Sequence, residues 1–175
     1  IVLEASEWLG GKAALLERNG FRFDMGPTIL MLPSVLKRIF AEAGRSLAQS
    51  LELVPLDPQW RCFFEDGGQL DLVPNTDQMS AAIERFAPET RSAAGYRRFM
   101  EISSRMHATS ERFFFWKSVG SVLDTVPASE LMSWNVLRDV LGLKFGRTVA
   151  GLVRSAIPVE RVAQMVDHFT QYVGS

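Results

Sequence analysis

Apolar and polar residues alternate in the first part of the chain with the period of a strand. Phe21-Arg22-Phe23-Asp24 alternates strictly, which is typical of a half-buried strand. Asn19-Gly20 precedes it, and this dipeptide is the one most favoured in a two-residue hairpin turn. Residues 13–18 lie on the other side of the turn, although their composition also suits a helix. The pattern predicts a β-hairpin centred on Asn19-Gly20.

Four further stretches have the apolar character of strands. Residues 1–4, Ile-Val-Leu-Glu, predict the end of a strand that is buried on both faces. Residues 51–55 predict another strand, and residues 60–64 are expected to pair with residues 69–73 across a Gly-Gly turn. A buried strand needs neighbours for its backbone hydrogen bonds. We therefore interpret the chain as an interior piece of a longer protein, with a small domain of unusual start as the alternative.

A period of three to four residues predicts helices elsewhere. The first is expected to begin at Pro33-Ser34 and to end at Gly44. From Asp77 onward the pattern is helical, and Pro88 is expected to start the second helix of this half, because proline is favoured at the first helical position. Further helices are expected over about 129–142, 144–156 and 158–172.

The composition excludes several classes of protein. The 175 residues include 19 Lys and Arg against 20 Asp and Glu, so the chain lacks the basic excess of a nucleic-acid-binding protein. A hydrophobic content of 47% provides ample material for a core and excludes a disordered chain. Cys62 is the single cysteine, which excludes a disulfide framework and a cysteine-based zinc site. No apolar run approaches the roughly 18 residues that a membrane-spanning helix needs.

Two short motifs near the N-terminus carry candidate chemistry. Glu4 ends the first predicted strand, and in dinucleotide-binding βαβ units an acid at the end of the second strand accepts hydrogen bonds from ribose hydroxyls. Gly10-Gly11 allows the backbone to approach a ligand closely, and Lys12 can face a pyrophosphate. Each motif alone is weak, because many strands end in Glu and a Gly-Gly pair is often an ordinary loop.

Taken together, Glu4, Gly10-Gly11-Lys12 and the stretch 20–28 (Gly-Phe-Arg-Phe-Asp-Met-Gly-Pro-Thr) resemble a known family. They are similar to the flavin-dependent carotenoid desaturases of the phytoene desaturase type, within the flavoprotein group that includes amine oxidases and protoporphyrinogen oxidase. The family pattern is an acid, a short spacer, Gly-Gly-Arg and a Gly-Phe-x-Phe-Asp-x-Gly-Pro-Thr hairpin. The resemblance is specific over residues 2–28 and weaker over most of the remaining chain.

The resemblance implies FAD as the cofactor. Glu4 would bind the ribose of FAD, and Gly10, Gly11 and Lys12 would line its diphosphate. Gly26, Pro27 and Thr28 would approach the flavin ring. Lys12 departs from the family pattern, which more often has arginine, and lysine lacks the two-pronged hydrogen bonding of a guanidinium. No general base is evident and the catalytic residue is unknown, which suits chemistry in which the cofactor accepts the hydride.

Phe113, Phe114, Phe115 and Trp116 form a run of four aromatic residues between two cations. Bulky rings with flanking cations are typical of an interfacial membrane anchor. The resemblance implies an apolar polyene substrate that is dissolved in a bilayer, so the run is a candidate for a monotopic membrane contact and for the point of substrate access. Four consecutive residues of a helix point in nearly all directions, so some of these rings are expected to be exposed. The core of a helical subdomain is the alternative.

The fold class predicted is α+β. Residues 1–50 would belong to a partial, Rossmann-like FAD-binding base, residues 51–76 to strands of a substrate-domain sheet, and residues 77–175 to a helical, membrane-facing substrate subdomain. His107, His168 and Cys62 are expected to be structural, and no metal site is expected.

The predicted function is FAD-dependent desaturation of a carotenoid polyene by a cytoplasmic protein peripheral to the membrane. The alternatives are another amine oxidase-like flavin oxidoreductase and a non-catalytic helical binding module.

Overall fold

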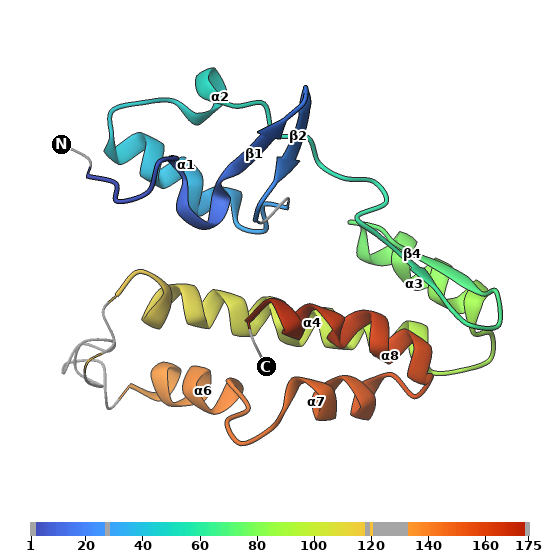
Figure 1. The fold of residues 1–175 in the computed structure, drawn as a ribbon. Coiled ribbons are helices and arrows are strands. Elements are labelled where there is room, and N and C mark those ends of the chain that lie inside the picture. The colour runs from blue at the N-terminus through green and yellow to red at the C-terminus, as the bar shows by residue number, and fades with distance from the viewer. Residues whose placement is uncertain (1–2, 27–28, 118–119, 121–132, 174–175) are drawn as a thin grey trace. The chain divides into compact units, whose positions relative to one another are not determined.

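The computed structural model describes residues 3–26, 29–117, 120 and 133–173 (Figure 1). The chain forms two compact units, Ile1–Val54 and Pro55–Ser175. Helices are combined with two separate two-stranded antiparallel sheets, one in each unit. The predicted α+β class is therefore confirmed.

The first unit is built on the predicted hairpin. Strand β1 (Leu15–Arg18) pairs with β2 (Phe21–Asp24) in the register Leu15 to Asp24 and Arg18 to Phe21. Asn19 and Gly20 join the strands with φ angles of 53° and 81°, the left-handed conformations that a type I′ turn requires. The hairpin predicted from Asn19-Gly20 is therefore confirmed. The prediction needed only these two residues, because their preference for left-handed φ angles favours this turn.

Short helices complete the first unit: η1 (Gly11–Ala13), α1 (Pro33–Glu42) and α2 (Leu47–Ser50). Helix α1 begins at the predicted proline, and Gly44 with a φ of 69° follows its end, as a helix-terminating glycine does. Ala14 is the one buried residue among the described residues of this unit.

The second unit is mainly helical. Strands β3 (Trp60–Phe63) and β4 (Gln69–Leu72) form its hairpin and confirm the predicted pairing. The helical elements follow in chain order: α3 (Thr76–Phe86), α4 (Ser92–Ser110), η2 (Glu111–Phe115), α6 (Trp134–Gly142), α7 (Val149–Ala156), α8 (Glu160–Asp167) and η3 (His168–Val173). The main core gathers residues of β4, α3, α4, α7 and α8, and a smaller cluster joins η2 to α6.

Helix α4 is the longest element and lies beside α6 and α7 (Figure 1). At Gly95 its backbone approaches the C-terminal end of α7 so closely that a Cβ atom would lie 1.9 Å from the carbonyl oxygen of Ala156. Tyr96 and Ala93, next to this contact, are both buried in the main core. The helices can pack at this distance only because residue 95 has no side chain.

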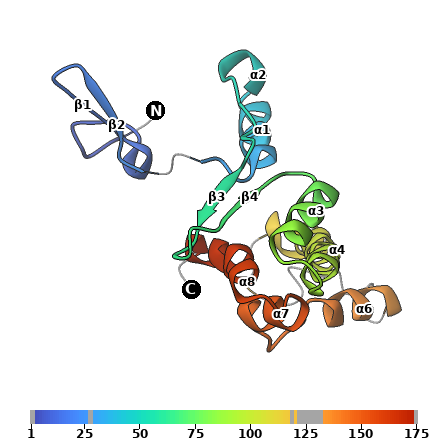
Figure 2. The same ribbon diagram turned by 90° about the vertical axis from the view of Figure 1, so that its right-hand side faces the viewer.

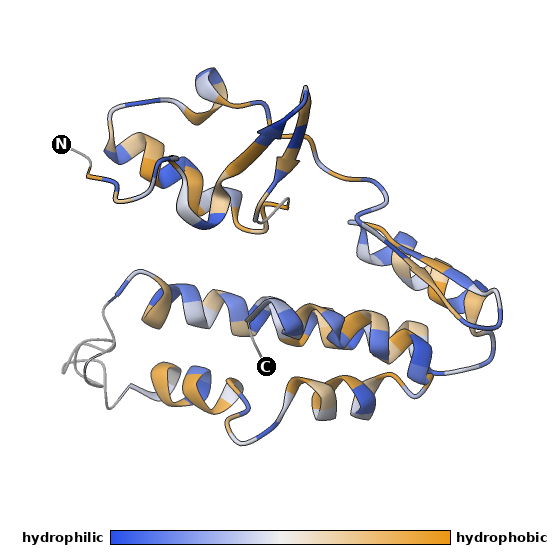
Figure 3. Cartoon of the chain, viewed as in Figure 1, coloured by the Kyte–Doolittle hydropathy of each residue, from blue (hydrophilic) through white to orange (hydrophobic). Residues whose placement is uncertain are grey.

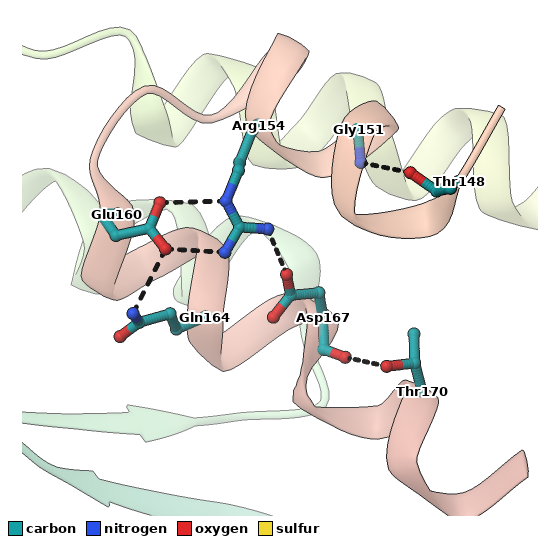
Figure 4. Close-up of polar contacts among 7 residues, drawn as sticks. All are labelled: Thr148, Gly151, Arg154, Glu160, Gln164, Asp167 and Thr170. Atoms are coloured by element: carbon teal, nitrogen blue, oxygen red, sulfur yellow. Dashed lines mark hydrogen bonds and ion pairs between the residues drawn. The ribbon is translucent and has the colours of Figure 1, made fainter. Parts of the chain in front are cut away.

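Polar side chains of α7 and α8 hold these two helices together (Figure 4). The Arg154 guanidinium donates to both carboxylate oxygens of Glu160, from Nε at 3.0 Å and from Nη2 at 2.6 Å, and its Nη1 donates to Asp167. Gln164 Nε2 donates to Glu160 Oε1 at 3.2 Å. One arginine therefore connects α7 to both ends of α8.

A second arginine joins the hairpin to α8. Arg161 forms an ion pair with Asp66 in the β3–β4 turn, and its guanidinium lies 5.6 Å and 5.3 Å from the ring centres of Phe64 and Phe86. The Gly68 N–H also donates to Asp66, and together with Arg161 it holds the pKa of the Asp66 carboxyl below its usual value. The β3–β4 hairpin is thus fixed to the helices at its turn (Figure 2).

Two predicted strands are wrong in the part that the structure describes. Leu3 and Glu4 are not in a strand, and Leu3 is 90% exposed, while residues 1–2 lie outside the described residues. Residues 51–55 form no strand either. A strand needs a partner for its N–H and C=O groups, and no strand of the described chain pairs with these two stretches.

The predicted helix starts at Pro88 and at residue 144 are also wrong. Glu89 has a φ of 60°, which a helix does not allow, and α4 begins only at Ser92. Lys144 and Gly146 likewise have positive φ angles, so α7 starts at Val149, where the Thr148 hydroxyl accepts from the Gly151 N–H. The part of the predicted 129–142 helix that precedes residue 133 lies outside the described residues.

We expect Gly95→Ala to lower the free energy of unfolding by about 1–3 kcal/mol, because α4 and α7 must move apart to accommodate the methyl group. Chemical denaturation measures this change. Gly142→Ala, at the end of α6, is the matched control: nothing lies within 4 Å of a Cβ at this position. The control is expected to be neutral or to stabilise the protein by up to about 1 kcal/mol. Equal effects of the two substitutions would contradict the close contact.

The Arg154–Glu160 pair predicts a dependence of stability on pH. Hydrogen bonds from Arg154 hold the pKa of the Glu160 carboxyl below its ordinary value of 4.5. The stabilisation is therefore present above the pKa of the unfolded chain and is lost as the pH falls through the lower folded-state pKa. Between pH 7 and pH 3 the melting temperature should fall less for Glu160→Gln than for the unmodified protein. Glu101→Gln, at an exposed position of α4, should retain the full dependence.

Candidate functional site

The residues singled out near the N-terminus form a tight backbone turn. Gly10 and Gly11 have φ angles of 107° and 53°, and the N–H groups of Ala13 and Ala14 donate to their carbonyl oxygens at 2.8 Å and 3.2 Å. Lys12 follows in the same turn with an exposed side chain. Because Gly10 lies far into the left-handed region, a side chain there would strain the turn.

The far end of the hairpin brings Gly26 against this turn. The Met25 N–H donates to the carbonyl oxygen of Ala14 at 2.9 Å, which extends the hairpin ladder by one hydrogen bond. A Cβ atom on Gly26 would lie 1.6 Å from the carbonyl oxygen of Lys12. Gly26 and Lys12, which are separated by the whole hairpin in the sequence, are therefore in backbone contact. Pro27 and Thr28 lie outside the described residues.

Glu4 is exposed and lies just before the bend of residues 5–10 that leads into the turn. The Ser6 N–H donates to its Oε1 at 2.8 Å. This hydrogen bond, with a further one from the Ser6 side chain, holds the pKa of the Glu4 carboxyl below its ordinary value of 4.5. Among the described contacts, Glu4 bonds to Ser6 and to no residue of the 10–12 turn, so the structure groups Gly10, Gly11, Lys12 and Gly26 but leaves Glu4 outside.

The chemistry of these groups fits a flavin dinucleotide. A carboxylate that is kept ionised accepts hydrogen bonds from a ribose diol, and an exposed lysine ammonium attracts a diphosphate as a point charge. Backbone without side chains at Gly10 and Gly11 allows a phosphate to approach the chain. The donor set is therefore compatible with the cofactor implied by the sequence.

The aromatic run is divided between interior and surface. Phe113 is 1% exposed and packs with Val136 of α6, and Phe114 is half-buried beside it. Phe115 and Trp116 are 42% and 39% exposed, and their rings meet edge to face at 5.1 Å. The short π-helix η2 contains the three phenylalanines, so neighbouring rings point to different sides. The expectation that some of the four rings are exposed holds for Phe115 and Trp116.

The remaining candidate residues lie among side chains of the second unit. Cys62 is half-buried in β3, and burial raises the pKa of its thiol, with a smaller contribution from the charge of Asp71. The His168 ring lies 5.0 Å from that of Trp60 and hydrogen-bonds to Gln171. Among the described residues, no three His, Cys, Asp or Glu side chains gather as metal ligands. None of the described helices has the length and apolar character required to cross a membrane.

A family profile described as flavin containing amine oxidoreductase matches residues 1–154. The match covers most of the chain, and the chain belongs to this family. Proteins of this family contain flavin, which confirms the expectation that FAD is the cofactor. The finer assignment, to the carotenoid branch, depends on the curated relatives.

Three curated relatives have names that refer to carotenoids. The chain is 29% identical over 174 residues to the 4,4'-diapolycopene oxygenase of Methylomonas sp, covering 99% of this chain and 34% of that protein. It is 33% identical over 156 residues to the carotenoid 3,4-desaturase of Haloarcula japonica, covering 89% and 29%. It is 42% identical over 113 residues to the phytoene dehydrogenase of Streptomyces griseus, covering 65% and 22%. These likenesses confirm the resemblance drawn from residues 2–28, and the chain spans about a third or less of each relative.

The sequence alone did not indicate why Gly26 is a glycine. The family resemblance implied that it approaches the flavin ring. In the structure the space beside Gly26 is filled by the carbonyl group of Lys12. The signal in the sequence was the pair of glycine motifs on either side of the hairpin, which allows the two backbone segments to touch.

We expect Gly26→Ala to separate the 10–12 turn from the hairpin, because a methyl group cannot lie 1.6 Å from the Lys12 oxygen. The amide of Met25 should then lose its protection in hydrogen exchange. Gly11→Asn is the matched control, since asparagine tolerates a φ of 53° and no atom lies within 4 Å of the added Cβ. Protection of Met25 that survives in Gly26→Ala would show that the two segments are not in contact.

Proposed function

We propose that the chain is part of an FAD-dependent enzyme that desaturates a carotenoid polyene. Two observations carry the proposal together: the chain belongs to a flavin-containing family, and its relatives are named for carotenoid substrates. Desaturation removes two hydrogen atoms from adjacent carbons, one as a hydride and one as a proton. FAD, when bound, supplies the acceptor for the hydride.

In this proposal the first unit is part of a Rossmann-like FAD-binding base. Glu4 accepts hydrogen bonds from the ribose, and Gly10, Gly11 and Lys12 lie along the diphosphate. Gly26, Pro27 and Thr28 are assigned to the side of the flavin ring. The contact between Gly26 and the carbonyl of Lys12 supports this arrangement, because it keeps both glycine segments at one end of the hairpin.

The second unit is proposed as the substrate subdomain, with the β3–β4 hairpin as part of its sheet. An apolar polyene is too insoluble to arrive through water, so the enzyme would be peripheral to the membrane on its cytoplasmic side. Phe115 and Trp116, the exposed members of the aromatic run, are the candidates for the point of substrate access, and Phe113 and Phe114 would support them from inside.

Oxygenation of a carotenoid is the second candidate function. It is favoured by the Methylomonas relative, which is named an oxygenase and matches 99% of the chain. Another amine oxidase-like oxidation is a third outcome, since the family description is that of amine oxidoreductases. The three reactions can be told apart by substrate and product. Desaturation removes hydrogen from the polyene, oxygenation adds oxygen to it, and amine oxidation consumes an amine instead.

The test is turnover by the full-length protein with its FAD, using phytoene and 4,4'-diapophytoene dispersed in detergent and a primary amine as alternative substrates. We expect visible absorption to appear as the conjugated system lengthens, with products lighter by two hydrogen atoms for each new double bond. Products that have gained oxygen would replace desaturation with oxygenation. Turnover of the amine alone would overturn the assignment to carotenoids.

Glu4→Ala tests the ribose contact in the same assay. Losing a charged acceptor for the ribose hydroxyls should weaken FAD binding by about 1–3 kcal/mol. Activity of this variant is therefore expected to be restored by excess FAD, with an unchanged rate at saturation. Glu7→Ala, which removes a nearby exposed carboxylate, should leave the affinity for FAD unaltered. Equal FAD affinities of Glu4→Ala and the unmodified protein would refute the assignment.

A further inference from the structure

Helix α4 carries arginine at regular intervals on its exposed side. Arg91 at the N-cap is followed by Arg98 and Arg105, and each lies seven residues after the one before it. Seven residues are close to two helical turns, so the three side chains start on the same side of the helix, about 10 Å apart. The buried Ala93 and Tyr96 lie on the opposite side, and hydrophilic and hydrophobic residues alternate along α4 in Figure 3. Arg91, Arg98 and Arg105 are called the arginine row below.

The arginine row has no carboxylate partner within the described residues. Arg97 of the same helix pairs with Asp77, with 3.2 Å between Nε and Oδ1, whereas the three members of the row are exposed and form no such pair. Glu101 is the one acidic residue of α4, and it forms no ion pair with the row. Arg112 continues the interval, but it lies in η2 and 3.6 Å from Asp139. The positive charge of the row is therefore available to another molecule.

The exposed side of α4 lacks the apolar groups that a bilayer contact or a permanent interface needs. Ala94 and Ala108 are the apolar residues beside the row, and no large apolar side chain of α4 is exposed. An interfacial membrane helix combines its cations with bulky apolar residues, and a permanent protein interface has an apolar core. The row therefore suits a reversible contact that is dominated by charge.

The seven-residue interval limits what can pair with all three arginines at once. A guanidinium forms two parallel hydrogen bonds with one carboxylate, which requires the carboxylate to lie at a defined position. A second helix has the same pitch as α4, so Asp or Glu at seven-residue intervals along it presents carboxylates at the spacing of the row. The headgroups of a fluid bilayer hold no such spacing.

We propose that the arginine row binds an acidic helix of another protein, one that carries Asp or Glu at seven-residue intervals. Each arginine of the row pairs with one carboxylate of the partner. Exposed ion pairs are individually weak and are screened by salt, so the contact forms and dissociates readily. The proposal does not depend on the proposed function, because the row includes none of the residues assigned to FAD or to substrate access.

The experiment measures the binding of two synthetic peptides to the full-length, FAD-loaded protein by fluorescence anisotropy. Both peptides are alanine- and glutamine-based helices of about 24 residues with three glutamates. The glutamates are seven residues apart in the matched peptide and five residues apart in the control peptide, which distributes them around the helix. At low salt the matched peptide should bind at least about tenfold more tightly, because it engages all three guanidinium groups. An ionic strength of about 1 M should abolish this difference.

Substitutions in the row test which side chains carry the binding. Arg98→Gln combined with Arg105→Gln, the glutamine variant, should lower the affinity for the matched peptide by at least about fivefold and make the two peptides equivalent. Arg98→Lys combined with Arg105→Lys keeps the charge but removes the paired hydrogen bonds, so its affinity should be intermediate. Arg45→Gln, which removes an exposed arginine of the first unit, is the matched control and should bind normally.

The proposal is overturned if the matched peptide does not bind, if the two peptides bind equally well at low salt, or if the glutamine variant retains the difference between them. Vesicles of phosphatidylcholine with phosphatidylglycerol test for a lipid instead. Vesicle binding that is lost in the glutamine variant, with no binding of the matched peptide, would assign the row to a lipid surface. A lower melting temperature of the glutamine variant, again without peptide binding, would show that another part of the same chain covers the row.

Discussion

Both units depend on a glycine that leaves room for the carbonyl group of a distant segment. In the helical unit, Gly95 of α4 lies against the carbonyl of Ala156, and this contact sets how closely α7 packs. In the first unit, Gly26 lies against the carbonyl of Lys12 and joins the hairpin to the turn that precedes it. At each point a Cβ atom would lie less than 2 Å from the carbonyl oxygen, so any other residue would force the two segments apart.

The parts of the fold that follow from local chemistry were predictable. Asn19-Gly20 forms the predicted turn, and the helical pattern expected from Asp77 onward is confirmed by α3, whose Met79 and Ile83 are buried. The predicted strands were wrong at residues 3–4 and 51–55 because a strand depends on a partner that the sequence pattern does not identify. The start of α4 was missed because Glu89 adopts a positive φ, in a turn where its N–H donates to the side chain of Glu84.

The sequence motif indicated the family but not the geometry of the motif's residues. The motif around Gly10, Lys12 and Gly26 pointed to the correct family, and the structure adds that two of its members touch through their backbones. Gly26 therefore has a packing role that the motif alone did not indicate. Similarly, the aromatic run was recognisable in the sequence, whereas its division into buried and exposed rings required the position of α6.

The π-helical turn at η2 has a consequence for how this region tolerates insertion and deletion. A π-turn holds one more residue than an α-helical turn, so it is equivalent to a single-residue insertion in α4. Removing one residue from Glu111–Phe115 would restore the ordinary helical period and rotate the following side chains by about 100°. Phe113 would then give up its place beside Val136 to a neighbouring ring, and α6 would lose its support. The length of this short segment, as much as its composition, thus determines which rings face the interior.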